Sequence, residues 1–219
     1  MPRALFVKEG DAVWMSHLDL MRVLQRSFRR AGLLLAHSQG FTPHPELSLA
    51  LPLSVGVSSG CEIMDFRLEE GQDTENLRER LNRVLPAGVR ILEIYDGGEK
   101  IRNLRLLRIE ITLEYDSGIP AGAPDAIKAL FDRKELLFEK TTKSGATVTQ
   151  NLLEMMQNVS VEETDADTLH VTCEISAQDP ALNPARITEA IARELPGYVP
   201  DFSAIRRLEV LTEDGTVFR

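Results

Sequence analysis

The stretch that decides the fold is residues 14–52, WMSHLDLMRVLQRSFRRAGLLLAHSQGFTPHPELSLALP. It contains the only tryptophan and three of the four histidines of the chain. Arginines crowd its first half, and prolines, a glycine and a phenylalanine crowd its second half. No later stretch has this density of such residues, so we expect the functional site to lie here.

The first half of this stretch predicts a helix at residues 17–31. Ser16 is a good N-cap, and Asp19 can reach back to it as the acidic member of a capping box. Gly32 ends the helix, because glycine accepts the left-handed conformation found there. Two stripes follow the helical spacing, an apolar one of Leu20, Met21, Leu24, Phe28 and Ala31 and a basic one of Arg22, Arg26, Arg29 and Arg30.

The basic stripe has two interpretations. Guanidinium groups on one stripe repel one another and are stabilised by an anion between them. Arginine binds phosphate through paired hydrogen bonds, so a nucleic-acid backbone is a natural partner. In the alternative, the stripe is an ordinary solvated helix face on which Arg22 pairs with Asp19 at i, i+3. The spacing alone leaves both open.

The second half of the stretch predicts a loop at residues 37–45, HSQGFTPHP, because its glycine and two prolines disfavour regular structure. Phe41 either stacks on a nucleobase or plugs the core, while the glycine and prolines shape the loop. The loop residues that we expect in a binding pocket beside the arginines are Ser38, Gln39, Gly40, Phe41 and His44.

The histidines are candidates for general acid–base catalysis, since imidazole titrates near neutral pH. His17 and His44 are the two candidates, and His44 is held stiffly between two prolines. In the alternative, these two and His37 are polar residues without a catalytic role. Their spacing fits no compact metal motif, so no metal site is predicted.

The rest of the first half alternates between strand and helix patterns. Strands are expected at 3–8, 47–57, 61–68 and 89–95, and a second helix is expected after Thr74. With the helix at 17–31, the order is strand, helix, strand, strand, helix, strand, which is the ferredoxin-like arrangement.

After a polar, glycine-containing linker the pattern starts again. Strands are expected at 107–115, 136–141, 169–175 and 205–211, and helices from Pro124 and Pro184. Lys143, Ser144 and Gly145 end the second of these strands, and an insertion is expected near 144–158. The prediction is an α+β protein made of tandem ferredoxin-like (βαββαβ) domains with antiparallel sheets: residues 1–96 with the site, a linker at 97–103, and residues 104–219.

Composition limits the functions that are open. The net charge is −9, which argues against a protein that coats nucleic acid with its whole surface. Residues 1–60 nevertheless carry six basic and four acidic residues, so the net charge is compatible with anion binding at one place in this part of the chain. The two cysteines, Cys61 and Cys173, lie far apart in unlike contexts, which favours a cytoplasmic protein without disulfides. No membrane span or signal peptide is expected.

Three segments resemble the signature of the bacterial radical-SAM-linked domain of unknown function: SHLDLMRVLQRSFRRAGL at 16–33, SQGFTPHPELSLALPLSVGVSS at 38–59 and CEIMDFRLEE at 61–70. Glu46 departs from the family pattern, in which a lysine commonly follows the PHP, so this version of the loop is less cationic. The positions that match the family motif are Ser16, His17, Asp19, Arg22, Arg29, Arg30, Ser38, Gln39, Gly40, Phe41, Pro43, His44, Pro45, Pro52, Gly56 and Asp65.

The resemblance implies a partnership with a radical SAM protein. The cysteine triad of its iron–sulfur cluster is absent here, so the cluster and S-adenosylmethionine are expected only on the partner and no cofactor in this chain. A looser, fold-level similarity exists to the tandem ferredoxin-like endonucleases that process CRISPR RNA.

The leading hypothesis is an accessory module, not catalytic by itself, that binds RNA or another anionic substrate for a partner radical SAM enzyme. Asp19 and the four arginines would bind beside the loop residues. One alternative is a metal-independent ribonuclease or RNA-modifying enzyme that uses His17 and His44. Another is an acidic protein–protein adaptor.

Overall fold

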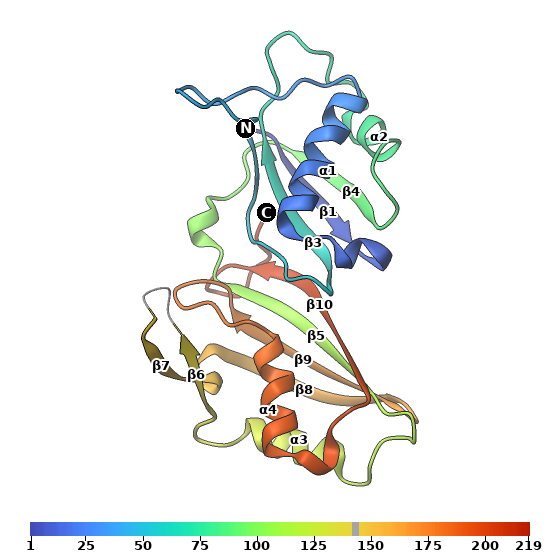
Figure 1. The fold of residues 1–219 in the computed structure, drawn as a ribbon, viewed down its shortest axis with the longest axis vertical. Helices are drawn as coiled ribbons and strands as arrows, with labels where there is room; N and C mark the ends of the chain where they lie inside the picture. Colours follow the sequence, from blue (N-terminus) through green and yellow to red (C-terminus); the bar gives the residue numbers. More distant parts are fainter. Residues whose placement is uncertain (142–144) are drawn as a thin grey trace. The chain divides into compact units, whose positions relative to one another are not determined.

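The computed structural model describes residues 1–141 and 145–219, and it divides into two compact units. Unit 1 comprises Met1–Ile101 with Arg219, and unit 2 comprises Arg102–Phe218 (Figure 1). The division falls inside the residues expected to form a linker, 97–103, where a short 3-10 helix, η2 (Ile101–Asn103), is found.

Unit 1 contains one antiparallel sheet with its helices. The central strand β1 pairs with β3 on one side and with β4 on the other, and β2 pairs with β3, so the strand order is β4-β1-β3-β2. The elements are β1 (Arg3–Lys8), η1 (Gly10–Trp14), α1 (His17–Arg30), β2 (Leu47–Leu49), β3 (Val57–Phe66), α2 (Leu77–Asn82) and β4 (Val89–Tyr95).

The core of unit 1 explains why α1 lies where it does. Leu20, Leu24 and Phe28 are buried against the sheet, as the apolar stripe predicted. The ring of Phe28 packs on that of Phe66 with centroids 4.9 Å apart. Burying one such side chain contributes about 1.5–3 kcal/mol, so this face fixes the helix and leaves the opposite, arginine-bearing face in solvent.

Two elements of unit 1 differ from the prediction. The expected strand at 47–57 is wrong after Leu49, because Pro52 lacks a backbone donor and Gly56 has a φ of +84°. The next strand starts earlier than expected, at Val57, and runs through residues 58–60, which the two expected strands left between them. Helix α2 begins at Leu77 rather than near Thr74, because Asn76 adopts a left-handed conformation (φ 50°).

The strands of unit 2 also pair in antiparallel fashion. Strand β5 pairs with β10 and with β9, and β8 pairs with β9, so the order is β10-β5-β9-β8. Strands β6 and β7 pair only with each other in this part of the described chain. The elements are β5 (Leu106–Glu114), α3 (Ala123–Phe131), β6 (Leu137–Thr141), β7 (Thr147–Asn151), η3 (Leu152–Met155), β8 (Met156–Asp165), β9 (Thr168–Ser176), α4 (Ala185–Glu194), η4 (Pro196–Tyr198) and β10 (Phe202–Leu211).

The prediction of an α+β protein with antiparallel sheets is confirmed. The expected strand at 136–141 is not part of the unit 2 sheet, because β6 forms a separate hairpin with β7. Within the segment expected as an insertion near 144–158, residues 147–151 form β7 of this hairpin, and β8 begins at Met156. Lys143 and Ser144 lie outside the described residues. Within the described residues, no helix is both long and apolar enough to cross a bilayer.

Candidate functional site

The start of α1 is held by a closed set of hydrogen bonds. The hydroxyl oxygen of Ser16 accepts the backbone N–H of Asp19 at 3.2 Å, and the hydroxyl donates to the Asp19 carboxylate at 2.7 Å. Arg22 donates to the other carboxylate oxygen at 3.1 Å. The Ser16 hydrogen bond, together with Arg22, lowers the pKa of the Asp19 carboxyl. The expected cap and the i, i+3 pair are confirmed, so Asp19 and Arg22 are already partnered with each other.

The other three arginines of the stripe are different. Arg26, Arg29 and Arg30 are exposed and form no ion pair with another residue that the structure describes. Arg29 and Arg30 lie in the last turn, where a cation also stabilises the partial negative charge of the helix end. These three guanidinium groups are the ones with donors available to an anion.

A chain segment returns alongside α1 after the helix ends. Leu33 and Leu35 are buried, whereas Leu34 between them is exposed. The side-chain amide of Gln72 bonds both backbone groups of Leu34, accepting from its N–H at 2.7 Å and donating to its carbonyl at 2.6 Å. Leu35 forms an antiparallel bridge with Leu68. The segment at residues 33–37 is therefore a fixed wall facing the helix.

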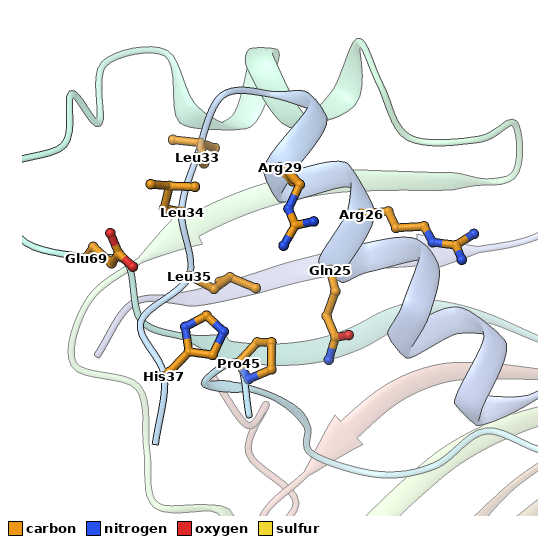
Figure 2. A pocket seen from close by; sticks show the side chains of 9 residues that line it. All are labelled: Gln25, Arg26, Arg29, Leu33, Leu34, Leu35, His37, Pro45 and Glu69. Atoms are coloured by element: carbon orange, nitrogen blue, oxygen red, sulfur yellow. The ribbon is translucent and has the colours of Figure 1, made fainter. Parts of the chain in front are cut away.

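A pocket of about 230 Å³ lies between α1 and this wall (Figure 2). Its floor is apolar and its rim is polar. In Figure 2 the Arg29 guanidinium and the His37 ring point into the space between helix and wall, and Glu69 lies across that space from Arg29, whereas Arg26 points away. The lining residues are Gln25, Arg26, Arg29, Leu33, Leu34, Leu35, His37, Pro45 and Glu69.

The loop that follows the wall is closed at its base and exposed at its tip. His37 bridges to Pro45, and the Ser38 backbone N–H donates to the His44 carbonyl at 2.9 Å. The Ser38 hydroxyl lies 2.8 Å from His44 Nδ1. Phe41 is fully exposed, so the alternative in which it plugs the core is wrong. Gln39 and Gly40 lie beside it, also exposed.

The structure brings together some predicted site residues and separates others. Arg26 and Arg29 share the pocket with His37, which the sequence prediction left without a role. Neither His17 nor His44 is among the described residues that line it. His17 is half-buried on the core side of α1, and its Nδ1 is buried without a described hydrogen-bond partner. The described residues therefore give no paired acid and base from His17 and His44 at this pocket.

The lining residues that the sequence prediction does not assign to the site include Gln25, Leu34 and Glu69. Gln25 precedes Arg29 by four residues, so helical spacing was a usable signal for it. The other two reach the pocket because the wall pairs with the chain after β3, where the Glu69 N–H donates to the Leu34 carbonyl at 3.0 Å. That contact depends on the tertiary fold and leaves no local signal.

Two positions that match the family motif are structural. Asp65 accepts two hydrogen bonds from the Arg3 guanidinium, at 2.6 and 3.0 Å, and Arg3 also donates to the Glu99 carbonyl at 2.8 Å. Gly56 has a φ of +84°, a left-handed conformation that favours glycine, and it lies against the Trp14 ring. Glu46 pairs with Arg67 at 2.8 Å. No described group of histidines, cysteines and carboxylates could hold a metal ion.

The fold and pocket define an α+β protein with a small pocket in unit 1 that carries an arginine and a carboxylate on opposite sides. The chain belongs to the family of uncharacterized proteins conserved in bacteria, DUF2344, which matches residues 2–184. No curated protein matches the sequence.

Solved structures with some likeness include a crystal structure of a Cbf5-Nop10-Gar1 complex, with a TM-score of 0.49 and 11% identity over 97% of this chain and 50% of that one. A crystal structure of the archaeal box H/ACA sRNP Nop10-Cbf5 complex matches with a TM-score of 0.46 and 11% sequence identity. That match covers 94% of this chain and 46% of the solved chain. The chain thus spans about half the length of these solved chains, and neither likeness supports a statement about function.

Proposed function

We propose that unit 1 is an RNA-binding module that recruits single-stranded RNA for a partner enzyme. The observation that carries the proposal is the pair Arg26 and Arg29, which have no described ion-pair partner and stand on the helix side of one pocket, with Arg29 pointing into it and Arg26 pointing outward from it. Hydrogen bonds from arginine to phosphate are short and strong, because donor and acceptor are both charged.

The loop adds a second kind of contact. Phe41 is fully exposed at the tip of a loop closed by Ser38 and His44. An exposed aromatic ring on a fixed loop breaks no packing contact within the protein when it stacks on a base. Single-stranded RNA offers unstacked bases for such stacking. With a net charge of −9, the rest of the protein repels nucleic acid, which confines binding to this face.

The partner in this proposal is a radical SAM protein, on the strength of the motif resemblance in residues 16–70. The iron–sulfur cluster and S-adenosylmethionine belong to that partner, and the complex works in the cytoplasm. Both cysteines of this chain, Cys61 and Cys173, are buried, which is compatible with that division of labour.

The proposal extends to the fold. We take the two units as two ferredoxin-like repeats. What supports this is the neighbour order of their strands, β4-β1-β3-β2 in unit 1 and β10-β5-β9-β8 in unit 2. These orders correspond strand by strand once the β6–β7 hairpin is set aside as an insertion.

The test is a fluorescence-anisotropy titration of a short, labelled single-stranded RNA of mixed sequence. The variant is the double substitution Arg26→Ala and Arg29→Ala. The control is Arg90→Ala with Arg206→Ala, which removes the same charge from exposed positions outside the pocket. We expect the pocket variant to bind at least about tenfold more weakly, since one hydrogen bond to a charged group contributes about 1.5–3 kcal/mol.

Equal affinity of the two double variants, or no RNA binding by the unsubstituted protein, would contradict the proposal. Co-purification with the radical SAM protein in the absence of nucleic acid, combined with that second result, would favour the adaptor alternative.

A further inference from the structure

We propose that the pocket beside α1 selects guanine, with the Glu69 carboxylate accepting hydrogen bonds from the N1–H and 2-amino groups of the base. The inference rests on the proposed function and deepens it, because it names the nucleotide that the RNA site reads.

Size points to a single base. At about 230 Å³, the pocket is smaller than the roughly 300–1,000 Å³ of sites for drug-sized ligands. A cavity of this size can hold one flat heteroaromatic ring. A base that is splayed out from a single strand is the form in which RNA is read by sequence-specific proteins.

The walls suit the faces of such a ring. Leu33 and Leu35 supply buried apolar surface at the floor, and Pro45 adds a rigid apolar side. The imidazole of His37 points into the same space (Figure 2). Aromatic side chains of this kind stack on splayed bases.

The charges are separated across the pocket. Arg29 belongs to the helix side, and Glu69 lies across the space from it (Figure 2). The two form no ion pair with each other or with another described residue, so both remain available to a ligand. A ligand that fills the space must present an anion at one end and hydrogen-bond donors at the other. A nucleotide does so with its phosphate and the edge of its base.

Hydrogen bonds of its backbone groups hold Glu69 in place. Its N–H donates to the Leu34 carbonyl at 3.0 Å, and its carbonyl accepts from the Gln72 side chain at 3.2 Å. The backbone that carries the Glu69 carboxylate is therefore fixed against the wall at residues 33–37.

The chemistry of a carboxylate then chooses the base. An ionised carboxylate only accepts hydrogen bonds, and its two oxygens match two parallel donors. Guanine alone among the four RNA bases has two adjacent donors, N1–H and the 2-amino group, on its pairing edge. Adenine, cytosine and uracil each place at least one acceptor beside the donor, and that acceptor would face the carboxylate.

The test uses short single-stranded RNAs that are identical except for one base, which is guanine, adenine, cytosine, uracil or hypoxanthine. Hypoxanthine keeps N1–H and lacks the 2-amino group. We expect the guanine RNA to bind tightest and the hypoxanthine RNA to bind about fivefold to a hundredfold more weakly, the range found for good paired contacts to a base.

Glu69→Gln should abolish this preference, because an amide offers only one acceptor, whereas Glu70→Gln makes the same charge change at an exposed neighbour and should keep it. Equal binding of all five RNAs, or a guanine preference that survives Glu69→Gln, would overturn the guanine assignment. Either outcome would leave RNA binding itself intact, whereas failure of the proposed function would appear as no binding of any of the RNAs.

Discussion

The Ser38 hydroxyl oxygen lies 2.8 Å from His44 Nδ1 and also accepts the backbone N–H of His44 at 3.2 Å. These two residues close the base of the loop whose tip carries Phe41. His44 therefore has a local structural role, and the histidine that faces the pocket is His37. A loop held in this way presents an exposed aromatic ring at a lower entropic cost than a free loop would.

Ser38→Ala should loosen this loop without unfolding unit 1. The substitution removes both contacts of the Ser38 side chain with His44, each of which contributes about 0.5–1.5 kcal/mol at most. Hydrogen–deuterium exchange should show faster amide exchange for residues 38–44. Ser54→Ala, at another exposed serine of unit 1, serves as the control. Unchanged exchange in the loop would show that the Ser38 contacts do not hold it.

Phe41→Ala should weaken RNA binding and leave thermal stability unchanged. The ring is fully exposed, so its loss removes no core packing. Stacking of one base on an aromatic side chain contributes about 1–3 kcal/mol, which corresponds to a fivefold to hundredfold weaker Kd. Phe41→Tyr should keep the affinity. A clear drop in Tm with unaltered RNA binding would show that the Phe41 ring supports the fold and does not contact RNA.

Asp65→Ala should be strongly destabilising, because it leaves the Arg3 guanidinium buried without its carboxylate partner. Breaking a buried ion pair by removing one member costs about 3–5 kcal/mol. Asp19→Ala removes only a solvent-exposed pair with Arg22 and a cap contact, so it should destabilise the protein much less than Asp65→Ala. Urea denaturation of both variants measures the difference. Similar losses would mean that the Arg3–Asp65 ion pair contributes no more to stability than the exposed Asp19–Arg22 pair does.

The thiol of Cys173 should be inert in the folded protein at mildly alkaline pH. Burial, and secondarily the charge of Glu174, raises its pKa to about 12. An unfolded cysteine titrates near about 8.5, so the folded state holds its proton more tightly. The stabilisation is complete below pH ~8.5 and is lost as pH rises from there toward the folded pKa.

Two measurements check this. Alkylation of Cys173 near pH ~8.5 should be slow without denaturant and fast in urea, where the thiol has its ordinary pKa. The free energy of unfolding of Cys173→Ala should fall less between neutral and strongly alkaline pH than that of the unsubstituted protein. Rapid labelling of the native thiol would show that its surroundings are open to solvent.

Much of unit 1 could be predicted because its signals are local. The cap at Ser16, the apolar stripe that includes Phe28 and the left-handed Gly32 are all set within one helix, and each was found as expected. The long strand expected at 47–57 failed because Pro52 and Gly56 interrupt a run of otherwise strand-forming residues. The hydrophobic pattern of residues 47–57 predicts a strand, but it does not take these backbone constraints into account.

The pocket was only half predictable. Arg26 and Arg29 follow from helical spacing, whereas Glu69 and Leu34 come together through pairing between segments more than thirty residues apart. For the same reason, no local signal marks His37, rather than the candidates His17 and His44, as the histidine that lines this pocket. In the hairpin at residues 37–45, the pairing register places His37 at the pocket and His44 beside Ser38. A loop sequence does not fix that register, and a shift of one residue would reverse which side chains face the pocket.

The most direct test of the central claim is the salt dependence of RNA binding. For a single strand, the slope of log affinity against log salt concentration changes by about 0.7 for each phosphate that the protein neutralises. The variant with Arg26→Ala and Arg29→Ala should therefore have a slope shallower by about 0.7–1.4 than the unsubstituted protein, because one or two phosphate contacts are gone. The control with Arg90→Ala and Arg206→Ala should keep the full slope. Identical slopes for all three proteins would contradict the claim that the α1 pocket holds the RNA backbone.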